Sequence, residues 1–391
     1  MTTLEIPHQI LSAGGDSTVD KMAKVVCLSP EKLLEKSVMS SIMKLSWSVV
    51  SIDEPHLALQ WGLSKTKFSK PFREAFSKLN SLNSLNTCFE IHTATLENVE
   101  GILKMLGRKD SAWFKQLEIP EKNNLTYFLF SGDRAPQNIL QLPSLKRALE
   151  DEIQCGITLI YVQKVQDGAN LQIELLDYCE MKNLINVNSD LPVGFLHSKL
   201  TEDSKKILLE KAVNLKIKVL IATSAAGAGI NIPVVQFIGW GLDREHTGLI
   251  QSQGRTARNK IESGNVIWVH QPKLHGRAVS SLSKVRDLLQ SECLRKTMNS
   301  WFKHKDSTIA VSNLDAEFCC SSCMLECIRK FNCLACSSRL STVEPQFGFD
   351  EHKFVTKLTQ FLCSLDINKR SPETTPVFKE KSLGKIDIIL Y

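Results

Sequence analysis

The stretch from Val219 to Asn231 reads VLIATSAAGAGIN, four apolar residues followed by two hydroxyl residues and then a run of small ones. Four consecutive apolar residues are typical of a parallel strand that is covered on both faces. Small residues after such a strand let a backbone or a phosphate approach closely, and the hydroxyls of Thr223 and Ser224 add hydrogen-bond donors. The stretch therefore predicts a strand of a parallel sheet that ends in a polar loop.

Similar apolar runs recur along most of the chain, and amphipathic stretches separate them. Thr201–Leu215 is typical of these stretches, because Thr201 can cap a helix and the apolar residues fall on one face. The alternation predicts an α/β fold. The expected strands are Val25–Leu28, Trp47–Ile52, Phe89–His92, Thr158–Val162, Lys218–Ala222, Val235–Trp240 and Val266–Val269.

The composition is that of an ordinary globular protein of 391 residues, with 43% hydrophobic residues, 23% charged residues and a net charge of +6. These values exclude a mainly disordered chain, a collagen-like fibre and a small disulfide scaffold. The N-terminal residues do not show a secretory signal. The uncharged run Val219–Leu242 is long enough to cross a bilayer, but its Asn, Pro and Gly residues favour two strands joined by a loop. We therefore expect no membrane partner.

Two adjacent carboxylates follow the strand that ends at Ile52, in the tetrapeptide Asp53-Glu54-Pro55-His56. Carboxylates at the end of a parallel strand can hold a hydrated magnesium ion through Asp53, while Glu54 polarises an attacking water. The alternative, acidic residues that cap the next helix, fits the tetrapeptide equally well.

Aromatic residues then alternate with lysines. Trp61, Phe68 and Phe72 are interleaved with basic side chains, a pattern that suits stacking on single-stranded bases. The alternative is an amphipathic segment whose aromatic side chains only pack.

The segment Gln251–Arg258 reads QSQGRTAR. Arg255 and Arg258 are three residues apart, so on a helix they would share one face and could grip a polyphosphate. An isolated pair of this kind is otherwise typical of a solvated surface.

In their order and spacing, eight segments together resemble the motor core of the RecQ-like superfamily 2 DNA helicases. The resemblance extends over about residues 20 to 340. The segments are Val26–Glu31, Asp53–His56, Leu59–Gly62, Thr93–Thr95, Thr158–Val162, Leu196–Ser198, Thr223–Asn231 and Gln251–Arg258.

The resemblance implies two RecA-like parallel-sheet domains, the first of them incomplete, followed by a small helical zinc-binding subdomain. The corresponding bounds are 1–117, 118–285 and 286–345, with a flexible tail over 346–391.

The resemblance also implies residue roles around ATP and magnesium. Asp53 would hold Mg²⁺ and Glu54 would act as the catalytic base. Arg255 and Arg258 would reach the ATP phosphates with support from Gln251.

Other matched positions would link nucleotide to DNA. His56 and Gln60 would couple the two, and Thr93 and Thr95 would transmit domain closure. The residues that would contact DNA are Trp61, Phe68, Phe72, Thr223 and Ser224.

Seven of the twelve cysteines lie between Cys293 and Cys336, which without an export signal favours a metal over disulfides. The segment resembles the zinc-binding subdomain of RecQ proteins, and four thiolates suffice for a structural Zn²⁺. Our first choice of ligands is Cys293, Cys320, Cys323 and Cys327, with Cys319 as a competitor. A second option pairs Cys320 and Cys323 with Cys333 and Cys336.

The sequence departs from the family in one important respect. No Gly-x-x-x-x-Gly-Lys-Ser/Thr loop, which would cradle the ATP phosphates, occurs in these residues. We therefore expect an N-terminally truncated first domain with an exposed sheet edge, and little or no ATP hydrolysis by this chain alone. Arg255 and Arg258 are retained, although Ala257 stands where the family usually has glycine.

Three functional hypotheses follow. The first is an ATP-dependent 3′–5′ DNA helicase of RecQ type that acts in the nucleus on single-stranded and duplex DNA. The second is a non-catalytic DNA-binding or regulatory remnant of such a helicase. A zinc-centred interaction module is the third, but it would leave the two arginines of Gln251–Arg258 without a reason.

Overall fold

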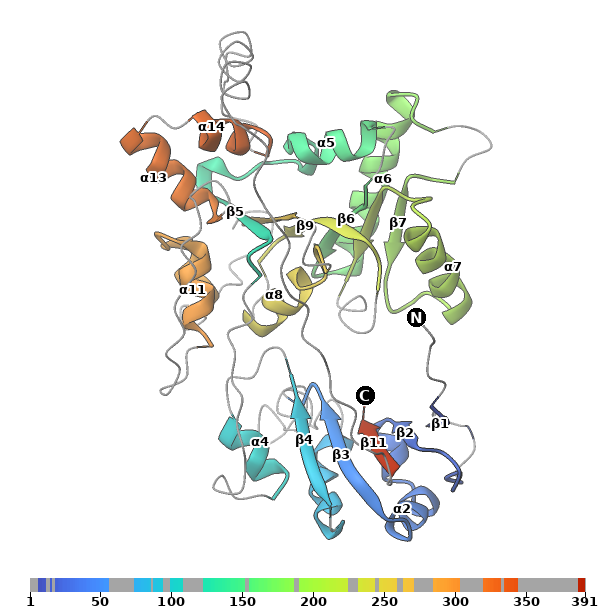
Figure 1. The fold of residues 1–391 in the computed structure, drawn as a ribbon. Coiled ribbons are helices and arrows are strands. Elements are labelled where there is room, and N and C mark those ends of the chain that lie inside the picture. The colour runs from blue at the N-terminus through green and yellow to red at the C-terminus, as the bar shows by residue number, and fades with distance from the viewer. Residues whose placement is uncertain are drawn as a thin grey trace, which may run out of the picture. The chain divides into compact units, whose positions relative to one another are not determined.

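The computed structural model contains two compact units, one formed by Met1–Leu117 with Lys369–Tyr391 and the other by Glu118–Asn368 (Figure 1). We call them unit 1 and unit 2, and each is treated by itself. The structure describes residues 6–11, 15, 18–55, 74–85, 87–93, 99–107, 122–151, 155–185, 190–223, 231–242, 246–258, 263–270, 284–302, 319–331, 334–343 and 386–390.

Unit 2 is built on a parallel sheet of six strands in the order β5-β10-β9-β6-β8-β7. Its strands consist mostly of consecutive buried apolar residues, as a sheet covered on both faces requires. The strands are β5 (Leu125–Ser131), β6 (Ile157–Val162), β7 (Val193–Leu196), β8 (Val219–Ala222), β9 (Val234–Trp240) and β10 (Gly264–His270).

Successive residues of each central strand enter different cores, because side chains alternate across a sheet. Leu159 of β6 packs in a core with Leu249 of α8 (His246–Gln253), and we call this side of the sheet the α8 face. Ile160 packs in the other core with Leu145 of α5 (Pro143–Glu150), on what we call the α5 face.

The remaining helices before the cysteine-rich segment cover these two faces. α6 (Val165–Met181) contributes Leu171 and Leu175 to the α5 face. α7 (Glu202–Val213) contributes Ala212 to the α8 face, and the Thr201 hydroxyl caps its start by accepting from the Ser204 N–H at 3.2 Å. Two short 3₁₀ helices precede α5, η3 (Gly132–Arg134) and η4 (Ile139–Gln141).

The cysteine-rich segment lies along β5, the outermost strand of the sheet. Cys320 forms a parallel bridge with Tyr127, and the Ser321 hydroxyl accepts from the Leu129 N–H at 3.2 Å. This contact covers backbone groups that an edge strand would otherwise expose. The helices of the segment are α10 (Val285–Leu289), α11 (Leu294–Ser300), α13 (Ser321–Phe331) and α14 (Leu334–Ser341).

Unit 1 is a parallel sheet of five strands in the order β1-β2-β11-β3-β4, with a core that includes Val26, Val50 and Ile52. The strands are β1 (His8–Leu11), β2 (Val25–Leu28), β3 (Trp47–Asp53), β4 (Cys88–His92) and β11 (Ile386–Leu390). The helices are α1 (Pro30–Leu33), α2 (Lys36–Met43), the 3₁₀ helix η1 (Glu74–Ser84) and α4 (Val99–Met105).

The expectation of a flexible tail over 346–391 is wrong at its end. Ile386–Leu390 forms β11, which pairs in parallel with both β2 and β3. Its sequence IDIIL is rich in β-branched residues, which favour a strand. β11 therefore fills the middle of the sheet, with β1 beyond β2 on its outer side.

The α/β fold class predicted from the sequence is confirmed, and every one of the seven expected strands is present to within one or two residues at each end. The uncharged run Val219–Leu242 contains β8 and β9 as expected. Among the described residues, no helix combines the length and the apolar character that a membrane crossing needs.

Gly239 in β9 tests how tightly the α8 face is packed. A Cβ at this position would lie 2.2 Å from Cε3 of Trp268, whose ring is buried and tilted against Phe237. Gly239→Ala is therefore expected to lower the free energy of unfolding by about 1–3 kcal/mol, measured by urea denaturation, because the indole must move. As a control, Ile173→Ala removes a side chain that is 60% exposed. This variant should change the free energy of unfolding by less than about 0.5 kcal/mol. Equal stability of the two variants would contradict this packing.

Candidate functional site

The acidic pair of unit 1 lies at the carboxyl end of β3, next to the end of β4. Asp53 is opposite His92 in the sheet register, and the Glu54 N–H donates to the His92 carbonyl at 2.9 Å. The Thr93 hydroxyl donates to Glu54 Oε2 at 2.9 Å. The structure thus brings together three of the predicted site residues, Asp53, Glu54 and Thr93.

The backbone at Glu54 is left-handed, with φ 47°. A non-glycine residue in this region carries strain of about 1–3 kcal/mol, which folded proteins retain mainly where the geometry serves a site. The Glu54 N–H also donates to Asp53 Oδ1 at 3.0 Å, which orients the Asp53 carboxylate, while the Thr93 hydroxyl orients that of Glu54. Two oriented carboxylates and a hydroxyl can hold a hydrated divalent cation and orient a water molecule.

Several predicted residues lie outside the described residues. These are His56, Gln60, Trp61, Phe68, Phe72, Thr95 and Ser224. Thr223 is described, buried at the carboxyl end of β8, where its N–H donates to the Leu196 carbonyl at 3.2 Å.

The two predicted arginines of unit 2 lie in the segment 254–258, which follows α8 and which we call the arginine loop. Arg258 Nη1 donates to Asn231 Oδ1 at 3.2 Å, so the loop contacts the last residue of the stretch Val219–Asn231. The Ala257 N–H donates to the Val234 carbonyl at 2.8 Å. Ala257 adopts φ 44°, which explains why glycine would suit this position.

Two residues that the sequence analysis missed hold the arginine loop through hydrogen bonds to its backbone carbonyls. Lys122 Nζ donates to the carbonyls of Gly254 at 2.7 Å and Thr256 at 3.2 Å. Asn124 Nδ2 donates to the Ala257 carbonyl at 2.9 Å. Burial lowers the pKa of Lys122, and the charges of Arg258 and Arg255 lower it further. Three cationic side chains therefore share this region, which favours an anion there.

Arg295 of α11 binds the backbone of residues 122–125, which carries the side chains that hold the arginine loop. It is buried, and its Nη1 donates to the Lys122 carbonyl at 2.8 Å while Nη2 donates to the Leu125 carbonyl. Its guanidinium also lies 4.9 Å from the centre of the Tyr127 ring. A buried guanidinium is tolerated when carbonyls and an aromatic face compensate its charge. Because Cys293 lies directly before α11, the cysteine-rich segment is linked to residues 122–125 through Arg295, and the arginine loop is linked to them through Lys122.

Lys122→Met tests the anchor, because it keeps the aliphatic stem and removes the ammonium group. The carbonyls of Gly254 and Thr256 then lose a charged donor, at a cost of about 1–3 kcal/mol. We expect faster amide hydrogen exchange in peptides that cover the arginine loop. Lys205→Met, on α7, is the matched control, since Lys205 pairs with the exposed side chain of Glu202. Unchanged exchange in the loop of Lys122→Met would show that Lys122 does not hold it.

Four thiols of the cysteine-rich segment converge in unit 2. The Sγ atoms of Cys293, Cys319, Cys320 and Cys323 all lie within 4.8 Å of one another. Three of the separations are 3.6 Å, 3.6 Å and 3.7 Å. Tetrahedral Zn–S bonds of 2.3 Å place sulfur atoms about 3.8 Å apart, so the arrangement fits a structural zinc site.

The thiols also influence one another's protonation. Hydrogen bonding from the Cys319 thiol lowers the pKa of Cys293, because it stabilises the thiolate. Thiolates are the form that binds zinc. Four sulfur ligands fill a tetrahedral shell and leave no open position for substrate, so such a site would be structural.

The cluster differs from our first choice of ligands and favours the competitor Cys319. Cys319 belongs to it and Cys327 does not. Cys327 is one helical turn beyond Cys323 on α13 and packs against the core of the α5 face, whereas Cys319 and Cys320 lie in the core of the α8 face. Cys336, from the second option, is also buried on the α5 face, and its partner Cys333 lies outside the described residues.

Metal analysis of cysteine variants distinguishes the two ligand sets. We expect one zinc ion per purified chain, and loss of most of it in both Cys319→Ser and Cys323→Ser, because either change removes a thiolate. Cys327→Ser is the matched control and should retain the metal. Loss of zinc from Cys327→Ser with retention in Cys319→Ser would contradict the observed cluster.

Comparison with known proteins agrees with these features. The family described as Helicase conserved C-terminal domain matches residues 142–260. The ATP-dependent DNA helicase RecQ of Bacillus subtilis is 22% identical over 306 residues, which are 72% of this chain and 47% of that protein. The aligned region thus spans about half the length of this relative. The matches support a superfamily 2 helicase.

Solved helicase structures resemble the fold. The DEAD-box helicase Mss116 bound to ssRNA and UDP-BeF is 16% identical, with a TM-score of 0.53 and coverage of 90% of this chain and 73% of that chain. The helicase Lhr of Mycobacterium smegmatis, bound to ssDNA and AMP-PNP, is 13% identical, with a TM-score of 0.51 and coverage of 90% and 44%. At these identities the likeness shows the RecA-like fold alone.

Proposed function

We propose that the chain is a DNA-binding unit of a RecQ-type 3′–5′ helicase, in which these residues bind single-stranded and duplex DNA but hydrolyse little ATP by themselves. The observation that carries the proposal is the arginine loop, in which Arg255 and Arg258 are presented on a backbone held by Lys122 and Asn124. Such a loop is suited to contact a polyphosphate.

The RecQ assignment rests on the cysteine cluster. Four thiols converge beside the edge strand β5, one directly before α11 and three at the start of α13, which agrees with the resemblance to a RecQ zinc-binding subdomain. The relative from Bacillus subtilis is a RecQ protein, and its aligned region extends over most of this chain.

ATP and magnesium would engage the two groups of residues that the sequence singled out. Asp53 and Glu54 supply oriented carboxylates for Mg²⁺ and water, with Thr93 as a hydrogen-bond donor. No Gly-Lys-Ser/Thr loop occurs in the 391 residues to supply backbone amides and a lysine for the phosphates. The absence of this loop from the sequence supports weak nucleotide binding and slow hydrolysis by this chain alone.

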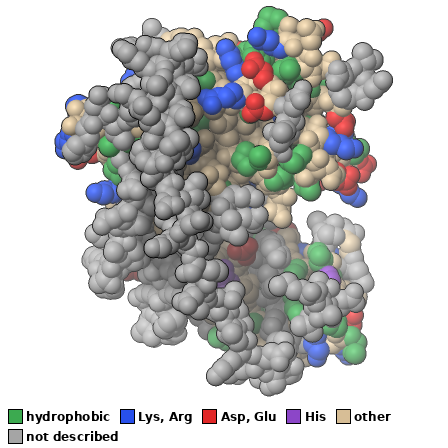
Figure 2. All heavy atoms as spheres, turned by 45° about the horizontal axis from the view of Figure 1, so that its top comes forward, with side chains coloured by type: hydrophobic (Ala, Val, Ile, Leu, Met, Phe, Trp, Pro, Cys, Tyr) green, Lys and Arg blue, Asp and Glu red, His purple; other side chains and the backbone are tan. Residues whose placement is uncertain are grey.

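DNA would be bound through stacking and through local positive charge. Trp61, Phe68 and Phe72 would stack on bases, and the hydroxyls of Thr223 and Ser224 would contact the backbone. On the described part of the face in Figure 2, basic and acidic side chains are interspersed. The net charge of +6 therefore does not form a broad basic surface on that part of the face. This favours binding of DNA strands through specific residues.

Binding of a fluorescent single-stranded oligonucleotide tests the DNA-binding proposal. Trp61→Ala should weaken binding by about 5- to 150-fold, the equivalent of about 1–3 kcal/mol for one lost base stack. Ile173→Ala, which removes an exposed apolar side chain from α6, should leave the affinity unchanged. Failure of the wild-type chain to bind, or equal affinity of the two variants, would contradict the proposal.

ATP hydrolysis separates the catalytic hypothesis from the non-catalytic one. We expect negligible DNA-stimulated turnover by the purified chain, measured as phosphate release. Robust turnover that Glu54→Gln abolishes would instead show that these residues hydrolyse ATP without the missing loop, because that change removes the base and keeps the shape of the side chain.

A further inference from the structure

A row of polar residues crosses the α5 face of unit 2, where the neighbouring positions are apolar. In the sheet register, Asn265 of β10 lies opposite both Thr126 of β5 and Gln236 of β9, and Gln236 lies opposite Thr158 of β6. Two residues further along the same strands, the four positions on this face are Phe128, Ile267, Ile238 and Ile160, all fully buried. The polar row is therefore a local break in an apolar face.

Most of the row is buried. Thr126 is 3%, Thr158 1% and Gln236 6% exposed. Buried polar groups lower stability unless they are hydrogen-bonded, so proteins seldom place several in one core without a use. Gln236 Nε2 donates to Thr158 Oγ1 at 3.3 Å, which fixes the orientation of the amide.

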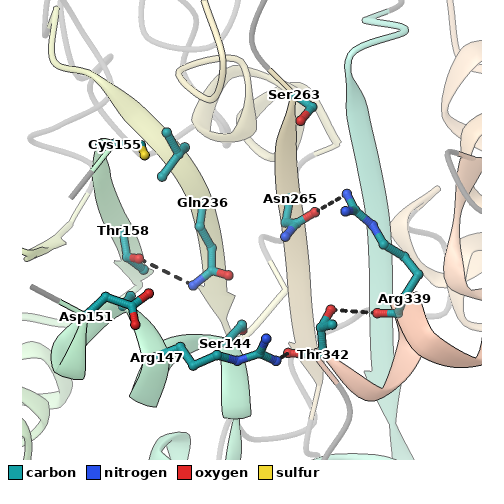
Figure 3. A pocket seen from close by; sticks show the side chains of 13 residues that line it. Ser144, Arg147, Asp151, Cys155, Thr158, Gln236, Ser263, Asn265, Arg339 and Thr342 are labelled. Carbon is teal, nitrogen blue, oxygen red and sulfur yellow. Dashed lines mark hydrogen bonds between the residues drawn. The ribbon is translucent and has the colours of Figure 1, made fainter. Parts of the chain in front are cut away.

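Above the row is a pocket with a volume of about 420 Å³, which Figure 3 shows from close by. Three members of the row, Thr158, Gln236 and Asn265, line the pocket, and each lies near the start of its strand. α5 and α14 form its walls, both on the α5 face, whereas the arginine loop belongs to the α8 face. The pocket is thus separate from the site described above, and its size suits a small molecule.

Two guanidinium groups reach this pocket from different helices. Arg339 of α14 donates from Nη2 to Asn265 Oδ1 at 3.0 Å and to Thr126 Oγ1 at 3.4 Å, so it is held over the polar row. Arg147 of α5 donates from Nη2 to the Thr342 carbonyl at 2.7 Å. Figure 3 shows Arg147 extending to Thr342 and Arg339 extending to Asn265, and both arginines line the pocket. Each guanidinium has five N–H donors in a planar fork that matches carboxylate and phosphate.

Other lining groups add to the polar character. Asp151 is the acidic side chain among the lining residues, so with Arg147 and Arg339 the formal charge of the lining is +1. The Ser144 hydroxyl is buried without a hydrogen-bond partner among the described residues.

We infer that this pocket is a binding site for a small oxyanion, a phosphorylated or carboxylated solute, at the amino ends of β6, β9 and β10. Arg147 and Arg339 bind the anionic group, and the Gln236 and Asn265 side chains contact the rest of the molecule. The inference does not depend on the proposed function, because no residue of the acidic pair, the arginine loop or the cysteine cluster takes part.

Cys155 offers a direct readout, because it is exposed and lines the pocket. Its rate of alkylation by iodoacetamide would be followed by peptide mass spectrometry in inorganic phosphate and, separately, in citrate. We expect one or both anions to slow alkylation saturably below about 10 mM, a range that includes weak millimolar sites. Cys88, an exposed thiol of unit 1, is the internal control and should react at an unchanged rate. The more protective anion distinguishes phosphorylated from carboxylated ligands.

Charge variants test which side chains bind the anion. Arg147→Gln should raise the anion concentration needed for half-protection of Cys155 by about tenfold, because a charge-assisted contact is lost. Arg329→Gln is the matched control, since Arg329 is an exposed arginine of α13 that pairs with Glu326 and does not line the pocket. No saturable protection by either anion, or equal effects of the two variants, would overturn the inference.

The paired change Thr158→Val with Gln236→Leu separates a ligand site from a structural hydrogen bond. Replacing both partners by apolar groups of similar shape leaves no donor or acceptor orphaned within the pair. We expect an unchanged or higher melting temperature together with weaker protection of Cys155. A lower melting temperature with unchanged protection would show that the polar row serves only the fold, and would contradict the inference.

Discussion

The hydrogen bonds at the start of β5 are the constraint on which unit 2 depends. The backbone of residues 122–125 is bound on one side by Arg295 and supports the arginine loop on the other through Lys122 and Asn124. A buried guanidinium that donates to carbonyls is stable only while those carbonyls stay in place. Lys122 contacts a segment 132 residues away in sequence, so one short turn joins distant parts of the chain.

The cysteine cluster is connected to the same strand, β5, through two of its cysteines. Cys320 pairs with Tyr127 in the middle of β5, and Cys293 directly precedes the helix that carries Arg295. A metal ion held by the four thiols would fix the start of α11 and the contact with β5 at once. One of its ligands directly precedes α11, and the other three lie at the start of α13. Structural zinc of this kind would act at a distance on the arginine loop, through backbone hydrogen bonds rather than through direct contact.

Much of the fold could be predicted because the strands are continuously apolar and each ends in polar residues. Strand β5 escaped that analysis, although LTYFLFS follows a turn at Asn123-Asn124 and has the aromatic and β-branched residues of a strand. The end of the chain was assigned to a tail because its neighbours are polar, and yet Ile386–Leu390 pairs with two strands. Local pattern alone could not show which strands would accept it.

The candidate site could be predicted only where the chemistry is local. Asp53, Glu54 and Thr93 meet because adjacent parallel strands end together, which the sequence pattern already indicates. Lys122 and Asn124 were missed because their partners lie far away in sequence. Cys327 was chosen on the resemblance to a RecQ zinc-binding subdomain, but the pairing of Cys320 with β5 brings Cys319 into the cluster instead.

If a metal ion binds the cysteine cluster, it supports the arginine loop through β5. Hydrogen exchange of the chain with zinc and after removal of the metal by a chelator tests it most directly. We expect faster exchange in the arginine loop and at residues 122–125 after removal of the metal, with β7 and β8 on the far side of the sheet unchanged. Equal protection of the loop in both states, or uniform loss of protection across the whole sheet, would contradict it.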